Sequence, residues 1–185
     1  MPGLPLDDRA IHYGDGLFET IAIRKGKARL WPLHVQRLVH GCQRLGLAPP
    51  DAAELKQALL AAVADSVVDV DHALVKIIVS AGSATRGYPR AVPSRARVLI
   101  GVFAADRLAT SHYQDGVLVV PCEMRIAEQA AFAGIKTLNR LEQVMARREW
   151  SDPEIFEGLM CDTSGRLICG TMSNVFIVRN EVLIT

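Results

Sequence analysis

The sequence lacks an excess of either charge. Its 21 Lys and Arg residues are balanced by 20 Asp and Glu residues, which leaves a formal net charge of +1. Because the two signs are well mixed along the chain, composition supplies no electrostatic argument for nucleic acid or for an anionic membrane. We therefore expect a small-molecule substrate, with neither nucleic acid nor membrane as a partner.

Paired cysteines are also lacking. The four cysteines are widely scattered and form no CxxC pair; they are Cys42, Cys122, Cys161 and Cys169. This spacing is unlike that of a disulfide framework or a zinc site. We expect reduced thiols in a cytosolic protein, and no metal.

No targeting segment, membrane span or internal repeat is visible. Residues 1–8 lack the basic-then-apolar pattern of a secretion signal, and no apolar run is long enough to span a bilayer. The sequence thus predicts a cytoplasmic protein. What it does have is 185 residues, 50% of them hydrophobic, enough to bury a real core in one large or two small domains.

Hydrophobic periodicity and turn residues predict an α/β chain with two domains. The expected helices are 32–45, ended by Gly46, then 51–65, begun by Asp51, and 139–150, begun by Thr137 or Asn139. The expected strands are 17–23, 28–31, 73–80, 97–104, 116–123, 156–162, 166–169, 174–179 and 182–184. We expect a smaller N-terminal domain over 1–106, a linker over 107–116, and the start of a larger cofactor-binding domain over 117–185.

One lysine occupies an unusual place in this pattern. Lys136 follows a small apolar Ala-Gly-Ile step and precedes the expected helix at 139–150. Partial desolvation and a nearby positive helix end both lower the pKa of an amine, as an amine nucleophile for a carbonyl requires. By position alone, a solvated surface lysine beside a helix is the more common case.

Four short motifs change that interpretation. In chain order they are GDGLFET at 14–20, LHVQRL at 33–38, VSAGSATRGY at 79–88 and GIKTLNRLEQV at 134–144. In this order and at these separations they resemble the class IV (branched-chain/D-amino-acid aminotransferase) family of pyridoxal-phosphate enzymes. Within the family, the third and fourth motifs are most similar to the aminodeoxychorismate lyase branch. The resemblance runs from about Asp8 to the last residue.

The resemblance implies the fold and the site. The fold is the D-amino-acid-aminotransferase-like one, with two domains, of which the second is incomplete in this chain. Lys136 would hold pyridoxal 5'-phosphate as a Schiff base, Arg37 would bind its phosphate with a rigid fork of donors, and Arg140 would also contact it. Arg86 and Tyr88 would contact the substrate. The reaction implied is conversion of 4-amino-4-deoxychorismate to 4-aminobenzoate and pyruvate, a step towards folate, by a homodimer.

The chain departs from the family pattern in two places. Cys169 stands where the family has a glutamate, five positions before Asn174, Val175 and Phe176. That glutamate normally pairs with the protonated pyridine nitrogen and keeps the ring an effective electron sink. A thiol is a weak hydrogen-bond partner and is mostly neutral at neutral pH. At 183–185 the chain also ends before a glycine-containing turn that supplies further phosphate-binding groups.

Other interpretations stay open at this stage. Arg37 can be a solvated arginine on an amphipathic helix, with His34 on the same face as a packing residue. The segment with Arg86 and Tyr88 can be a plain hairpin turn. At the level of function, the alternatives are a class IV branched-chain or D-amino-acid transaminase and a catalytically inactive fragment.

Overall fold

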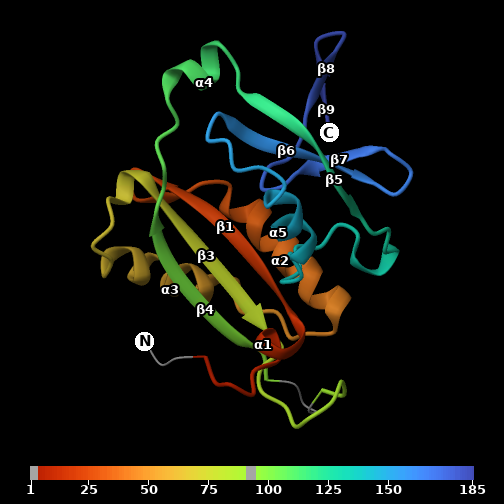
Figure 1. Ribbon diagram of the computed structural model, residues 1–185. Coiled ribbons are helices and arrows are strands. Elements are labelled where there is room, and N and C mark those ends of the chain that lie inside the picture. The colour runs from red at the N-terminus through yellow and green to blue at the C-terminus, as the bar shows by residue number, and fades with distance from the viewer. Residues whose placement is uncertain (1–3, 91–94) are drawn as a thin grey trace. The chain divides into compact units, whose positions relative to one another are not determined.

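A four-stranded antiparallel sheet carries the N-terminal part of the chain (Figure 1). The computed structural model describes residues 4–90 and 95–185. The sheet has the order β2-β1-β3-β4. Its strands are β1 (Gly16–Arg24), β2 (Lys27–Ala28), β3 (Ala73–Ser80) and β4 (Arg97–Ala104). The strands expected at 73–80 and 97–104 are confirmed residue for residue.

Alternation along β1 and β3 decides which face of the sheet is buried. Residues at every second position of both strands are buried and lie opposite each other, as in the pairs Leu17–Val79 and Ile21–Val75. They share one core with buried residues of two helices, α2 (Trp31–Leu45) and α3 (Ala52–Ala64). Both helices therefore cover the same face of the sheet.

The ends of these helices follow from local chemistry. The side chain of Asp51 accepts hydrogen bonds from the amides of Ala53 and Glu54 and so caps α3. Gly46 ends α2 in the left-handed conformation at φ 65°, as expected. The return strand expected at 28–31 is wrong beyond Ala28, because Leu30 takes a positive φ of 52° and turns the chain into α2.

The structure also contains several short helical elements. They are α1 (Arg9–Tyr13), α4 (Thr110–Gln114) and the 3-10 turns η1 (Val70–His72) and η2 (Ala130–Phe132). The side chain of Asp8 caps α1, and Gly14 ends it at φ 59°. In the part of the chain that the structure describes, no helix combines the length and the apolar composition needed to cross a membrane.

A second, smaller sheet lies in the C-terminal part of the chain. Its strands are β5 (Leu118–Ile126), β6 (Ile155–Asp162) and β7 (Leu167–Gly170), with β5 parallel and β7 antiparallel to β6. Helix α5 (Leu141–Arg147) packs on it through a core of Cys122, Ala146, Trp150 and Met160. A separate hairpin, β8 (Ile177–Arg179) and β9 (Val182–Ile184), turns at Asn180 and Glu181, as expected.

The third helix is shorter than expected. It begins at Leu141, not at residue 139, and its N-cap is Arg140, which makes no capping hydrogen bond through its side chain. The proposed caps are wrong for a structural reason in the case of Thr137: that residue is buried and forms a bridge to Leu17 of β1. The segment before the helix is thus bound to a strand.

Contacts divide the chain into two units. The first comprises residues 1–107 and 132–138, and the second comprises 108–131 and 139–185. The division after Arg107 lies next to the expected start of the linker. The lysine segment 132–138, however, belongs to the first unit and not to the second, and residues 108–116 belong to the second unit and include α4.

Candidate active site

The lysine segment is an added piece of strand beside β1. The amide of Phe18 donates to the carbonyl of Lys136 at 2.9 Å, and the amide of Leu138 donates to the carbonyl of Gly16 at 3.0 Å. Ile135 and Thr137 are buried, whereas Lys136 between them is half-buried. This alternation turns the Lys136 side chain away from the helix-covered core.

The start of β1 has to be glycine for this pairing. A Cβ atom at Gly16 would collide with the carbonyl oxygen of Val79 and would lie 2.8 Å from Cδ1 of Leu138. The glycine therefore allows β3 and the lysine segment to approach β1 from its two sides. The GDGLFET motif thus has a direct steric role in seating Lys136.

The Lys136 amine lies over an aromatic ring. Its Nζ is 4.5 Å from the centre of the Phe18 ring, and Nζ of Lys76 is 5.0 Å from the same centre. Phe18 and Lys76 both lie on the sheet face opposite α2 and α3, since their strand neighbours Leu17 and Val75 are in the core. The two ammonium groups concentrate positive charge there, which suits an anionic ligand.

Arg37 is bound to a buried carboxylate that the sequence analysis did not identify. Its Nε donates to Oε1 of Glu19 at 2.7 Å and its Nη2 to Oε2 at 2.5 Å, while Nδ1 of His34 lies 2.7 Å from Oε2. Glu19 is 1% exposed, and the Arg37 side chain is 43% exposed. The hydrogen bond to Glu19 raises the pKa of Arg37, so its charge is permanent.

The exposed part of Arg37 borders a depression on the surface of α2. This depression has a volume of about 620 Å³ and is lined by Leu33, Gln36, Arg37, Val39, His40 and Gln43. Arg37 is thus a fixed cation with one side held by Glu19 and the other towards solvent. It lies on the helix side of β1, whereas Lys136 lies over Phe18 on the other side.

Arg86 and Tyr88 lie on the loop that follows β3. The Tyr88 side chain is exposed and its ring lies 5.4 Å from that of Tyr13, centre to centre. Arg86 is exposed at a hollow of about 210 Å³. The other residues that line this hollow are Asp7, Arg9, His12, Tyr13, Ala84 and Thr85. Both candidate substrate residues are therefore available at the surface of the first unit.

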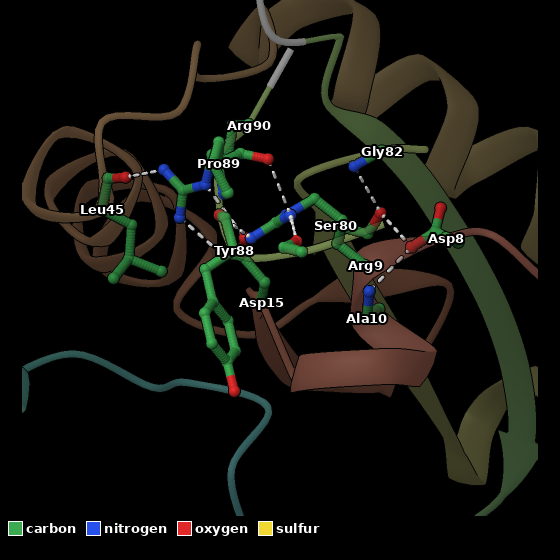
Figure 2. Close-up of polar contacts among 11 residues, drawn as sticks. Asp8, Arg9, Ala10, Asp15, Leu45, Ser80, Gly82, Tyr88, Pro89 and Arg90 are labelled. Atoms are coloured by element: carbon green, nitrogen blue, oxygen red, sulfur yellow. Dashed lines mark hydrogen bonds and ion pairs between the residues drawn. The ribbon is translucent and has the colours of Figure 1, made fainter. Parts of the chain in front are cut away.

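A cluster of three charged residues supports this loop (Figure 2). Asp15 accepts hydrogen bonds from Arg9 and from Arg90, and its side chain is only 11% exposed. Burial by itself raises the pKa of Asp15, but the hydrogen bonds and charges of Arg90 and Arg9 outweigh it, so the pKa lies below its ordinary value. No sequence motif singled out Arg9 or Arg90.

Cys169 and Arg140 both belong to the second unit. Cys169 lies on β7, opposite Met160 of β6, and packs half-buried against the core of that unit. Arg140 precedes α5. Burial lowers the pKa of Arg140, while the charges of Cys169 and Glu142 act in the opposite direction.

A second buried carboxylate holds the residues after Cys169. Glu157 of β6 is 4% exposed and accepts hydrogen bonds from Thr171, Met172 and Ser173. Burial raises the pKa of Glu157, but the hydrogen bonds from Thr171, Ser173 and backbone amides outweigh it and lower the pKa. Glu157 thereby shapes the segment that begins the motif around Asn174.

Comparisons with known proteins found relatives over nearly the whole chain. A family model described as amino-transferase class IV matches residues 16–185. An aminodeoxychorismate lyase from Vibrio harveyi is 33% identical over 183 residues, which is 98% of this chain and 66% of the relative. The crystal structure of 4-amino-4-deoxychorismate lyase from Pseudomonas aeruginosa has a TM-score of 0.88 at 41% identity and covers 99% of this chain, with 66% of that protein matched.

A further relative has two named activities. A bifunctional aminodeoxychorismate lyase / D-amino acid transaminase from Mycobacterium tuberculosis is 29% identical over 187 residues, or 97% of this chain and 63% of the relative. The chain thus spans slightly less than two thirds of the length of these relatives.

Proposed function

Because the chain belongs to the class IV aminotransferase family, we propose that it is a pyridoxal-phosphate-dependent lyase that converts 4-amino-4-deoxychorismate to 4-aminobenzoate and pyruvate. One observation carries the proposal: the lysine of the lyase-like GIKTLNRLEQV motif is seated on β1 with its amine over the Phe18 ring. The likeness to named lyases at 33% and 41% identity supports the same choice.

Two residues, which the first unit holds on opposite sides of β1, have the chemistry that the cofactor needs. Lys136 offers a half-buried primary amine beside an aromatic face, and Arg37 offers a permanent, part-exposed guanidinium for a phosphate. Arg140 and Cys169 are the second unit's candidates, Cys169 for the pyridine nitrogen. When bound, pyridoxal phosphate supplies an electron sink for the carbon that bears the substrate's amine.

Lys136 would act as both base and acid. Its Nζ would take the proton from the amine-bearing carbon, so that loss of the enolpyruvyl group leaves an aromatic ring. The same Nζ would then give a proton to the departing enolpyruvyl group, which becomes pyruvate. Arg86 and Tyr88 would hold the dicarboxylate substrate through a guanidinium and an aromatic ring.

Cys169 fits this reaction better than it fits a transamination. A thiol stabilises a protonated ring nitrogen less than a glutamate would, which weakens the electron sink. An elimination that makes its product aromatic is driven by that aromaticity and needs less electron withdrawal. We therefore propose that the lyase reaction tolerates cysteine at this position.

A second candidate is transamination of branched-chain or D-amino acids, and the bifunctional relative favours the D-amino-acid form. An inactive fragment is the third, because the chain matches only about two thirds of its relatives. We further propose that the whole protein is a cytoplasmic homodimer, as the family resemblance implies.

Capture of the cofactor tests the proposal. The purified chain is incubated with pyridoxal phosphate and reduced with borohydride, and the labelled peptide is located by mass spectrometry. We expect the label on Lys136 and its loss in Lys136→Ala. Lys56→Met is the control, since Lys56 is an exposed lysine of α3 in the same unit, and it should keep the label on Lys136. A label on any other lysine would remove Lys136 from the mechanism.

Product analysis separates the three candidates. Formation of 4-aminobenzoate with equimolar pyruvate supports the lyase, and transfer of the amine of a branched-chain or D-amino acid to a keto acid supports the transaminase. A labelled Lys136 with neither product identifies an inactive fragment.

A further inference from the structure

Arg9, Asp15 and Arg90, here called the arginine cluster, join the loop 84–90 to the beginning of β1 (Figure 2). We propose that the arginine cluster is a positioning device that presets this loop for an aromatic carboxylate ligand, with Arg9 as its central residue. The proposal rests on the proposed function, in which Arg86 and Tyr88 of the loop contact the substrate. It adds residues that act on ligand binding by holding the backbone of the loop.

Arg9 binds the loop through its backbone. Its Nη1 donates to the carbonyl oxygens of Gly87 and Pro89 at 3.1 and 3.2 Å, and its Nη2 donates to that of Tyr88 at 2.8 Å. Its Nε donates to Asp15 at 2.7 Å. Three consecutive carbonyl groups thus converge on one guanidinium, which is 6% exposed. Only a planar fork of donors can serve three such acceptors and a carboxylate together.

Arg90 fixes the end of the loop, next to the three carbonyl groups that Arg9 binds. It donates to both carboxylate oxygens of Asp15, and also to the carbonyl of Leu45 in the last turn of α2. A cation at a helix C-terminus is stabilised by the unpaired carbonyl groups there. Asp15 therefore lies between two arginines, of which Arg9 binds the carbonyl groups of 87–89 and Arg90 follows them directly in the chain.

The arginine cluster is attached, through Asp15, to the start of β1, where the lysine segment also pairs. The carbonyl of Asp15 accepts from the amide of Ala81, and the next residue, Gly16, accepts from the amide of Leu138 in the lysine segment. The relative position of the loop and the lysine segment is thus set through Asp15 and Gly16, two adjacent residues at the start of β1. All of these contacts lie within the first unit.

Asp8 fixes the start of the loop independently. Its carboxylate accepts from the hydroxyl of Ser80 at 2.7 Å and from the amide of Ala10 at 2.9 Å, and the Ser80 hydroxyl accepts from the amide of Gly82 at 2.9 Å (Figure 2). The side chain of Asp8 is fully buried. The base of the loop therefore holds even where the arginine cluster is altered, so cluster variants should loosen the loop's far end without unfolding the sheet.

In this loop the backbone is held while the side chains are exposed, which indicates that the cluster positions the loop for a ligand. The loop's carbonyl groups at 87–89 are bound by a buried arginine, while the side chains of Arg86 and Tyr88 are exposed. A loop that is ordered before the ligand arrives has already lost the conformational entropy that binding would otherwise remove. Loosening it should weaken ligand binding and leave the lysine chemistry intact.

The test uses three variants of the purified chain and one control. Arg9→Met removes the fork, Arg9→Lys keeps a charge without the fork, and Arg90→Met removes the second arm while Arg9 still pairs with Asp15. The control is Arg107→Met, which removes an arginine from an exposed ion pair with Asp69 in the same unit. Each is measured by hydrogen exchange of the amides at 84–90, by affinity for 4-aminobenzoate, and by borohydride labelling of Lys136.

We expect faster exchange of the loop amides and about tenfold weaker 4-aminobenzoate binding in Arg9→Met and Arg90→Met. Arg9→Lys should fall between these and the parent chain. Labelling of Lys136 should be unchanged in all of them, which also shows that the variants are folded. Arg107→Met should match the parent chain in every measurement.

Three results would overturn the inference. The first is unchanged loop exchange in both Met variants, and the second is faster exchange with unchanged 4-aminobenzoate affinity. The third is failure of the parent chain to bind 4-aminobenzoate while its loop is protected. That third result rejects the proposed substrate and leaves the cluster a purely structural role, so it is distinguishable from the other two. If Arg9→Met does not fold, Arg90→Met and Arg9→Lys decide.

Discussion

At the scale of the residue, Glu19 shows how a strand's periodicity reveals a polar site. It occupies the same face of β1 as Leu17, Ile21 and Ile23, all of which are buried in the core. A carboxylate at such a position needs hydrogen-bonding partners, and α2 supplies His34 and Arg37 three residues apart. Arg37 therefore supports the fold as well as being the candidate for the cofactor phosphate.

Replacing Glu19 by Gln should lower stability and leave Arg37 less firmly held. The amide cannot accept from Arg37 and His34 as a carboxylate does, and we expect a loss of about 2 kcal/mol. The loss stays below that of a fully buried pair, because Arg37 is part-exposed and water can replace its partner. The midpoint of urea unfolding measures it.

Asp69→Asn is the control for Glu19→Gln. Asp69 pairs with Arg107 at the surface, and its replacement should leave the midpoint unchanged. Equal midpoints for Glu19→Gln and the parent chain would show that the buried carboxylate contributes nothing.

The cysteines provide a second residue-scale prediction. Burial raises the pKa of the Cys42 thiol to about 11, and its side chain is inaccessible in the core. Because the thiolate is the reactive form, iodoacetamide at pH 8 should leave Cys42 unmodified in the native chain. The half-buried Cys161 and Cys169 should react first, as mass spectrometry of the peptides will show. Modification of Cys42 as fast as Cys161 in the absence of urea would contradict its burial.

At the scale of the element, the pairing of the lysine segment with β1 requires a position without a side chain, Gly16. Gly16→Ala places a methyl group against the Val79 carbonyl and the Leu138 side chain. We expect the segment 136–138 to separate from β1, with slower labelling of Lys136 by pyridoxal phosphate and a loss of about 1–3 kcal/mol from the strain. Labelling and urea unfolding measure the two effects.

Thr20→Ala on the same strand is the matched control. Thr20 is exposed, so its truncation should change neither measurement appreciably. If Gly16→Ala labels Lys136 at the parent rate, the pairing with β1 does not seat the lysine.

The segment after β7 makes an element-scale prediction about pH. Glu157 has a pKa below its ordinary value, because the hydrogen bonds that it accepts outweigh the effect of burial. A carboxyl whose pKa is depressed by folding stabilises the native state above its unfolded pKa of about 4.3, and this contribution disappears as the pH falls through the folded pKa. Below about pH 4 the backbone amides of Thr171 and Met172 should therefore lose protection against exchange, measured relative to their intrinsic rates at the same pH.

Glu157→Gln should abolish that pH dependence. The amide group of glutamine lacks one of the two acceptor oxygens, so the backbone amides of Thr171 and Met172 should be weakly protected at every pH. Slow exchange at these positions in the variant would show that Glu157 does not hold the segment.

At the scale of the whole molecule, the strands differ widely in how much of their surface is buried. β3 pairs with a strand on each side and buries alternate side chains, whereas every residue of β8 and β9 is exposed and the two pair as a separate hairpin. An isolated two-stranded hairpin is marginally stable in water. Hydrogen exchange should therefore be fastest at 177–184 and slowest in β3. The reverse order would mean that the hairpin is buried in solution.

The sequence by itself was sufficient for the elements with strong local signals. The strands at 73–80 and 97–104 follow from alternating apolar residues, and the ends of α2 and α3 follow from a glycine and an aspartate. The family, too, was recognisable from four motifs in order, because they are short stretches whose residues are contiguous. Where the signal was weak, as at 28–31 and 139–150, the predicted boundaries were wrong.

Only the tertiary structure decided what the polar residues bind. Glu19 meets Arg37 from 18 positions away, and Arg9 meets the carbonyl groups of a loop 78–80 positions away. The placement of Lys136 on β1, and not at a helix end, likewise depends on a pairing with Gly16 and Phe18. Local propensity carries no information about such partners, because a buried charge is satisfied by whichever groups the fold brings within hydrogen-bonding distance.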